Sequence, residues 1–371
     1  MAIDKSLPNK KVEIPGLQEQ AEQQIEIQEN LPNQGETEIT PTEDGGVEIN
    51  FEPGAFSQEQ SESNFDNLAE LLPEETLNPL GSELAQNYQE YKASRKDWET
   101  SYAKGLDLLG FKYETPSEPF QGASGATHPV LSEAVTQFQA LAYKELLPAD
   151  GPVRTRVIGV QTPQKNDQAN RVKEFMNYQL MDVMKEYEPE FDQMLFYLPL
   201  SGSAFKKVYY DDLLGRTVSK FVPADDLIVP YNATSLEDAE AVIHRIKISE
   251  NDLRKQQVAG FYRDIELPKP FNQETEVEKK ERMLEGTKRT FNEDMHTLLE
   301  FHINLDLEGF EDRGPDGQET GIKLPYIVTV EEGSREILSI RRNYEIADPK
   351  KQKIPYFVHF KFLPGLGFYG F

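Results

Sequence analysis

The sequence contains no cysteine among its 371 residues. This absence excludes disulfide frameworks, thiolate zinc sites and cysteine nucleophiles. No apolar run approaches the roughly 18 residues that a membrane-spanning helix needs. The first residues, MAIDKSLPNKK, also lack the apolar stretch of a secretory signal peptide. We therefore expect a soluble protein or a subunit of a soluble assembly.

Basic residues are scarce relative to acidic ones. The chain has 39 Lys and Arg residues against 65 Asp and Glu residues, a formal net charge of −26. A surface this acidic repels a phosphate backbone and cannot gain affinity by releasing counterions from it. Tight, stationary binding of nucleic acid is therefore not expected, whereas loose passage of DNA past the protein is compatible with the charge.

The common enzyme motifs are also missing. Gly286-Thr287-Lys288 does not form a P-loop, because it lacks the upstream glycine and the strand-to-helix setting. There is no GxSxG, no HExxH and no dinucleotide-binding fingerprint. We therefore expect no catalytic, cofactor-binding or metal-binding residues. The residues alone predict a non-enzymatic α+β structural protein.

Two pairs of aspartates suggest a metal site at first sight. Asp211 and Asp212 lie in one predicted turn, and Asp225 and Asp226 lie in another. Aspartates in turns commonly bond to their own backbone, and neither pair belongs to a calcium loop or has a histidine partner. We prefer the turn interpretation. A hydrolase that uses the aspartates near residues 211 and 225 is the alternative.

The histidines and methionines favour structural roles. His128, at a loop-helix junction, has no nucleophile or carboxylate beside it and is expected to cap or pack. His296 and His302 share one face of a predicted strand, but two histidines without a third ligand are weak evidence for a metal site. The methionines expected to pack between helices are Met176, Met181, Met184 and Met194.

The first fifth of the chain has an unusual composition. Residues 1–80 hold 18 acids and 3 bases, a net charge of −15, and are rich in Gln, Asn, Pro and Gly. Such a segment cannot bury enough apolar surface to offset the entropy lost on ordering. We predict a disordered acidic tail with two apolar islands, Val47–Phe51 and Phe65–Leu72, either of which could dock on a partner.

Helical periodicity dominates residues 81–200. The predicted helices cover residues 80–110, 129–147, 166–187 and 190–198. The second follows a small-residue loop at residues 122–127, with Thr127 as a candidate cap, and its predicted buried stripe is Leu131, Val135, Phe138, Ala142 and Leu146. The third has an apolar stripe that includes Val172, Phe175 and Met176. The alternating residues 154–160 predict a strand.

Residues 201–371 are predicted to be mainly β. The expected strands cover residues 204–210, 217–222, 227–230, 241–248, 296–305, 322–330, 337–342 and 354–362. Ser249 is expected to cap a helix that reaches about residue 259. The charged residues 260–295 predict an exposed excursion with a helix over residues 274–284. The predicted fold is therefore α+β, a helical N-terminal part packed with antiparallel sheets.

Several segments, in this order along the chain, resemble the portal proteins of tailed bacteriophages, most closely those of short-tailed phages. The segments are Phe120–Thr127 with Pro129, Glu145–Pro148 and Gly151–Val153, then Tyr187–Asp192, Leu198–Asp211, Val222–Asp226, Gly260–Tyr262 and Pro364–Gly370. The resemblance covers about residues 80–371, and the order of the segments carries it.

The resemblance implies a portal wing, which mixes helices and strands. Residues 81–200 would form its mainly helical part and residues 201–371 its mainly β part, preceded by the acidic tail. The stem, clip and channel regions of a portal protein would follow Phe371. The chain is therefore expected to be an N-terminal fragment.

By the same resemblance, the chain is expected to be a structural subunit of a portal ring, typically of twelve copies, at one vertex of a viral capsid. Viral double-stranded DNA would pass through the ring during packaging and genome ejection. The implied partners are other copies of the chain, the terminase packaging ATPase, and capsid and tail-connector proteins, with no membrane. Assembly would occur in the host cytoplasm and the final location would be the virion. Another head-tail adaptor or a scaffolding-type assembly protein is the alternative.

Overall fold

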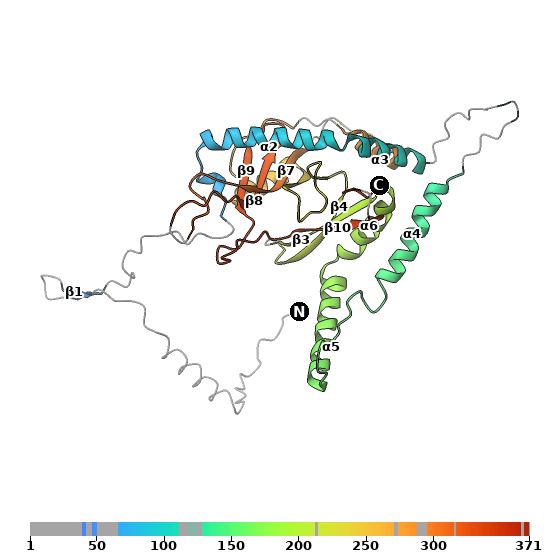
Figure 1. Cartoon of the computed structure of the whole chain (residues 1–371), viewed down its shortest axis with the longest axis horizontal. Coiled ribbons are helices and arrows are strands. Elements are labelled where there is room, and N and C mark those ends of the chain that lie inside the picture. Colours follow the sequence, from blue (N-terminus) through green and yellow to red (C-terminus); the bar gives the residue numbers. More distant parts are fainter. Residues whose placement is uncertain are drawn as a thin grey trace, which may run out of the picture. The chain divides into compact units, whose positions relative to one another are not determined.

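The structure is a computed structural model of the chain (Figure 1). It describes residues 39–41, 47–49, 66–110, 120, 122, 128–211, 214–270, 274–287, 295–314, 317–364 and 367–370. The chain divides between Ser63 and Asn64 into two units. In the first, β1 (Ile39–Pro41) pairs antiparallel with β2 (Val47–Ile49), which lies at the start of the apolar island predicted at residue 47. The rest of the predicted tail up to residue 65 lies outside the described residues.

The second unit is α+β, as the sequence predicts. Its helices are η1 (Leu68–Glu70), α2 (Glu74–Ser94), α3 (Lys96–Leu109), α4 (Val130–Leu146), α5 (Pro163–Tyr178), η2 (Gln179–Val183), α6 (Tyr187–Ser201), α7 (Glu250–Val258) and α8 (Glu276–Glu285). Its strands are β3 (Ser203–Asp211), β4 (Arg216–Pro223), β5 (Leu227–Ile228), β6 (Ala241–Ile248), β7 (His296–Leu305), β8 (Leu324–Glu331), β9 (Ile337–Arg342) and β10 (Phe357–Lys361). Every strand end lies within three residues of the predicted one: β6, β7 and β9 have the predicted bounds, whereas β5 and β10 are shorter than predicted.

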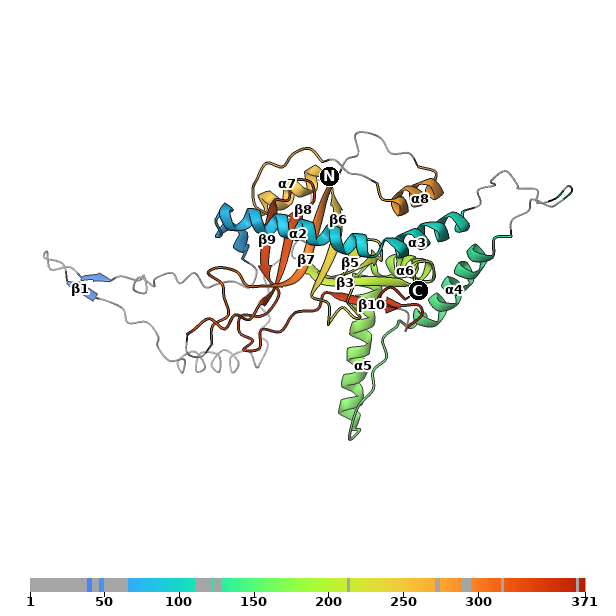
Figure 2. The same ribbon diagram turned by 45° about the horizontal axis from the view of Figure 1, so that its top comes forward.

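A five-stranded antiparallel sheet, in the order β5-β6-β7-β8-β9, forms the centre of the second unit. Helix α2 lies across one face of it (Figures 1 and 2). Leu77, Leu84 and Tyr88 from the helix pack on Phe301 and Val328 of the sheet, all nearly inaccessible to solvent. Burial of large side chains of this kind stabilises the fold by about 1.5–3 kcal/mol each.

The outer edge of β9 is covered by residues that were predicted to be disordered. The side-chain amide of Asn67 donates to the carbonyl of Leu338 at 3.1 Å, and its oxygen accepts from the backbone N–H of Ile340 at 3.0 Å. Leu68 and Ala69 are fully buried beside it. The prediction of disorder as far as residue 80 is therefore wrong for residues 66–80. Among them, Asn67 to Ala69 protect a sheet edge.

A second antiparallel sheet, in the order β10-β3-β4, carries α6 on one face. Met194, Leu195 and Leu198 of α6 are buried against this sheet with Ala204. The two sheets meet through a shared apolar cluster that includes Phe205. Its other buried members are Val222, Ala224, Leu227, Val229, Ala233, Ala239, Val242 and Phe368.

Helical periodicity located the helices but misplaced several of their ends. The predicted helix at residues 80–110 is two helices, α2 and α3, which meet at Arg95. Helix α4 has Pro129 at its N-terminus, and Thr127 lies outside the described residues. Val135 is buried as predicted, but Leu146 is exposed because Leu147 takes the buried position instead.

The largest disagreement concerns residues 154–187. Residues 154–160 are extended but pair with no described strand, so the predicted strand is wrong. Helix α5 begins at Pro163 with Thr162 as its cap, earlier than predicted. It buries no residue, so the stripe predicted to be core is exposed. Met184 and Met194 are buried as expected, whereas Met176 is exposed.

Residues 274–287 are also more integrated than predicted. Helix α8 begins with a capping box formed by Thr275 and Glu278. Val277 is fully buried against Tyr102 and Leu106 of α3. The prediction of an exposed excursion is therefore wrong for this helix, because α3 covers its one buried apolar residue, Val277.

Gly81 sets the closest approach between α2 and the sheet. A Cβ atom at this position would lie 2.3 Å from the backbone carbonyl oxygen of Arg335, in the turn between β8 and β9. A backbone atom cannot move aside as a flexible side chain can. Helix α2 therefore reaches the sheet only because residue 81 has no side chain.

We predict that G81A lowers the free energy of unfolding by about 1–3 kcal/mol, because overpacking forces helix and turn apart. The matched control is G105A in α3, where a Cβ atom would meet nothing within 4 Å. G105A should stabilise the protein by up to about 1 kcal/mol through helix propensity alone. Urea unfolding followed by circular dichroism measures both, and equal effects would contradict the role assigned to Gly81.

Candidate functional site

The junction between α2 and α3 carries a fully engaged, buried arginine. The guanidinium of Arg95 donates to the carbonyl oxygens of Ala224 at 3.0 Å, Asp225 at 2.5 Å and Leu227 at 2.9 Å. Its Nε atom also donates to the carboxylate of Glu99 at 2.9 Å, and its side chain is only 4% exposed. Arg95 therefore fixes the helices to the turn that leads from β4 into β5.

Aromatic rings enclose the same guanidinium. It lies 5.3 Å from the ring centre of Trp98 and 5.8 Å from that of Tyr369. These two rings stack on each other with centroids 4.6 Å apart, and the indole N–H donates to the carbonyl of Ser201. Cation–π contacts of this kind add to the hydrogen bonds where water is excluded.

A second buried arginine connects to the first through Asp225. Arg245 on β6 lies 2.8 Å from a carboxylate oxygen of Asp225, 2.8 Å from Asp226 and 2.8 Å from Glu278 on α8. Burial lowers the pKa of Arg245, but the three carboxylates outweigh burial and hold the pKa well above its ordinary value. The guanidinium therefore stays charged and holds α8 against the sheet.

Glu281 on α8 lies beside this network and forms no ion pair with a base of the described residues. The hydroxyl of Tyr102 donates to its carboxylate at 3.3 Å. Burial, followed by the negative charge of Asp225, raises the pKa of Glu281 to about 7. This carboxyl is therefore a member of the cluster that changes charge near neutral pH.

A separate charged cluster joins the two sheets. Lys207 on β3 lies 2.6 Å and 2.8 Å from the two carboxylate oxygens of Glu300 on β7. His302 lies 2.7 Å from the same carboxylate. Burial raises the pKa of Glu300, but Lys207 and His302 outweigh it and hold the pKa well below its ordinary value. His244, nearby, is kept neutral because burial lowers its pKa to about 3.

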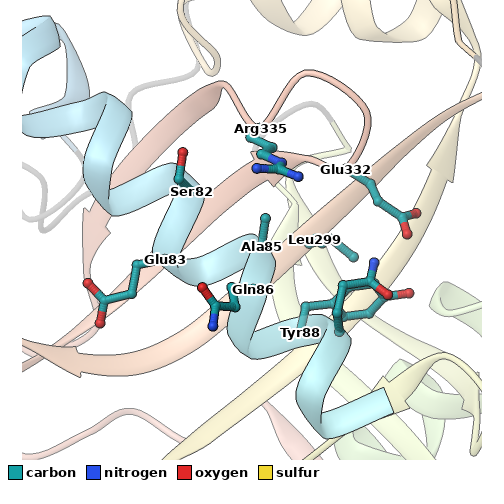
Figure 3. Close-up of a pocket in the computed structure, with 9 residues that line it drawn as sticks. Ser82, Glu83, Ala85, Gln86, Tyr88, Leu299, Glu332 and Arg335 are labelled. Carbon is teal, nitrogen blue, oxygen red and sulfur yellow. The ribbon is translucent and has the colours of Figure 1, made fainter. Parts of the chain in front are cut away.

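A cavity of about 530 Å³ lies between α2 and the turn that joins β8 to β9 (Figure 3). Its walls include Glu83 and Gln86 from the helix, and Glu332 and Arg335 from the turn. Burial raises the pKa of Glu332. The residues that line it include hydrogen-bond donors and acceptors of both charges, and no hydrogen bond joins a nucleophile to a base among them.

The structure separates the aspartates that suggested a metal site. Asp211 accepts a hydrogen bond from the backbone N–H of Leu214 at 3.0 Å, the turn role predicted for it, and Asp212 lies outside the described residues. Asp225 is buried and paired with two arginines. The arrangement of Asp211 and Asp225 therefore does not support the hydrolase alternative.

The histidines likewise lie apart. His128 is exposed, whereas His296 and His302 are both buried. His296 lies 3.6 Å from Glu331 and His302 contacts Glu300. Within the described ranges, no group of three or more His, Asp or Glu side chains is arranged to hold a metal ion. No described helix is both long and apolar enough to cross a membrane.

Sequence reasoning missed the residues that the structure brings together most tightly. Arg95 follows Tyr91 by four residues and precedes Trp98 by three, so it occupies a position in the buried stripe of the predicted helix. A charged residue at such a position is the signal that could have identified it. Lys207 and Glu300 carry no comparable local signal, because their contact joins strands 93 residues apart.

Comparison with known proteins gives no independent identification. No protein-family model matches the chain, and no curated protein matches it. The function is therefore argued from the residues, the geometry above and the resemblance of the individual segments.

We predict that R95K destabilises the protein by about 2–4 kcal/mol, because an ammonium cannot reproduce the planar array of donors to three carbonyl groups. The matched control is R254K, at an exposed pair with Asp264, which should change stability by less than about 0.5 kcal/mol. Urea unfolding measures the difference, and similar small effects for both variants would refute the importance assigned to Arg95.

We also predict a pH-dependent stabilisation by E281Q. Since the pKa in the fold lies near 7, above the ordinary 4.5, the folded protein keeps a proton that the unfolded chain releases. Wild-type stability therefore falls as pH rises through this window. At about pH 8, E281Q should be about 2 kcal/mol more stable than the wild type, with little difference near pH 4.

Thermal unfolding across this pH range checks the prediction for Glu281. The exposed carboxyl of Glu285, on the same helix, provides the control variant E285Q. A stability difference between E281Q and wild type that is constant with pH would show that the Glu281 carboxyl is not the titrating group.

Proposed function

We propose that the chain is a structural subunit of a viral portal ring, the conduit for DNA packaging and genome ejection at one capsid vertex. Its partners are then further copies of itself, the terminase packaging ATPase, capsid and tail-connector proteins, and the double-stranded DNA that passes through. The proposal places it in the virion after assembly in the host cytoplasm.

The observation that carries the proposal is the convergence of segments that resemble portal sequences. The segment Val222–Asp226 supplies two of the carbonyl groups bound by Arg95. The segment Pro364–Gly370 supplies Tyr369, whose hydroxyl donates to Leu227 at 3.1 Å beside the same guanidinium. Segments more than 130 residues apart therefore build one structural centre, which supports a shared fold as the cause of the resemblance.

A second junction supports the same interpretation. The segment Leu198–Asp211 includes Gly202, at the end of α6, whose carbonyl accepts from the backbone N–H of Phe362 at 2.9 Å. A Cβ atom on Gly370 would lie 2.7 Å from this carbonyl oxygen. The backbones at Gly202 and Gly370 thus approach each other closely, and both glycines belong to segments that carry the resemblance.

The charge of the chain suits a conduit. A channel through which DNA slides must not hold the phosphate backbone, and a net charge of −26 provides no counterion-release affinity. The buried ion pairs also suit a subunit that stays rigid while its cargo moves, because breaking a buried pair costs about 3–5 kcal/mol.

The test is the assembly state of the protein expressed from the complete reading frame that contains this sequence. We expect ring-shaped particles in negative-stain electron microscopy and a matching oligomer in analytical ultracentrifugation. A protein that remains monomeric at all accessible concentrations would contradict the proposal. A neighbouring terminase gene would separate a portal from the alternative, another head-tail adaptor or a scaffolding-type assembly protein.

A further inference from the structure

Residues 151–178 form an arm that stands apart from the two sheets. The extended residues 151–162 lead outward, and α5 returns, extending away from the sheets in both views (Figures 1 and 2). The amide of Asn177 bonds to Val153 in both directions, at 2.9 Å and 3.3 Å, and Thr155 donates to the carbonyl of Ala169 at 3.0 Å. The arm is therefore held together by its own side chains.

The arm presents apolar side chains that the described part of the chain leaves exposed. Val172, Phe175 and Met176 form a stripe at helical spacing on α5, with Phe175 60% exposed. At the tip, Ile158 is 91% exposed and Val160 is 76% exposed. Single exposed apolar residues are ordinary, but a helix that buries none of its residues and presents such a stripe marks an interaction surface.

The charge of the arm is opposite to that of the rest of the chain. The arm holds five bases and two acids, a net charge of +3, which leaves −29 for the remaining residues. Arg154, Arg156 and Arg171 are exposed, and none forms an ion pair with a carboxylate of the described residues. An exposed basic surface on so acidic a chain is complementary to another copy of that chain.

We propose that the arm docks on the acidic surface of a second copy of this chain, covering the stripe of α5. Contact between two arms is disfavoured, because both carry the same sign of charge. The interface is therefore head-to-tail, with different surfaces on the two copies. The contact is argued from the arm alone, and only its place within a closed ring rests on the proposed function.

Substitutions on the exposed stripe of α5 should not disturb the folded core, because the core begins beyond the arm. Helix α5 passes into the π-helical turn η2, and the first buried residue after α5 is Met184, beyond the arm. Since α5 buries no residue, substitutions on its stripe should leave folding intact. They change the exposed surface and little else.

The test compares self-association of the 371-residue chain with that of F175D. Sedimentation equilibrium should show concentration-dependent association of the wild type and at least a tenfold weaker association of F175D, with unchanged thermal unfolding. The matched control is L141D on α4, an apolar residue of similar exposure, 69%, outside the arm. L141D should associate as the wild type does.

The charge component is tested separately with R154E/R171E. This variant should also weaken association at least tenfold at low salt, and the effect should shrink at high salt, where exposed charges are screened. The control K104E/K144E reverses two exposed lysines on α3 and α4 and should behave as the wild type. Equal effects of the two charge reversals would show that net charge, rather than the arm, governs association.

The possible failures are distinguishable. Association of F175D equal to that of the wild type, or a wild type that stays monomeric, would overturn the arm inference. Rings that form equally well in F175D would overturn it while leaving the proposed function intact. Arm-dependent association without rings would support the inference about the arm and contradict the proposed portal function. Binding of a short DNA duplex by the arm, without self-association, would assign it to nucleic acid instead.

Discussion

The described fold depends on one buried guanidinium. Removing a charge from water costs several kcal/mol unless hydrogen bonds and opposite charges replace the lost hydration. Arg95 obtains these from three carbonyl groups, Glu99 and Asp225, so each of these groups must be held in place. The turn between β4 and β5, the break between α2 and α3, and the position of Tyr369 are consequences of satisfying this one side chain.

The buried cations contribute little to the charge of the surface. Arg95, Arg245 and Lys207 are engaged with interior carboxylates and carbonyl groups. Because each of these cations is paired with acidic side chains, the clusters largely cancel their own charge. The charge of the surface is therefore set by the remaining side chains, which are mostly acidic. The arm is the exception, and this contrast gives one chain two surfaces that attract each other.

Strands were the most predictable part of the structure, because alternation identifies a face directly. Ala241–Ile248 and Ile337–Arg342 have the predicted bounds. The break at Arg95 could not be placed, because α2 and α3 have one continuous apolar periodicity and only the tertiary contacts of the arginine interrupt it. The cluster at Lys207 and Glu300 was equally hidden, since it depends on how two sheets meet.

The error at α5 has a different physical origin. Val172, Phe175 and Met176 have the spacing of a core stripe, and periodicity shows that a helix face is apolar without showing what covers it. The same spacing is selected whether the face packs on its own chain or on a neighbour. In α2 the stripe is buried by the sheet, whereas in α5 it is exposed and flanked by exposed bases. The sequence of α5 predicts burial, yet the described residues leave its apolar stripe exposed, and a covering surface on a second copy accounts for both observations.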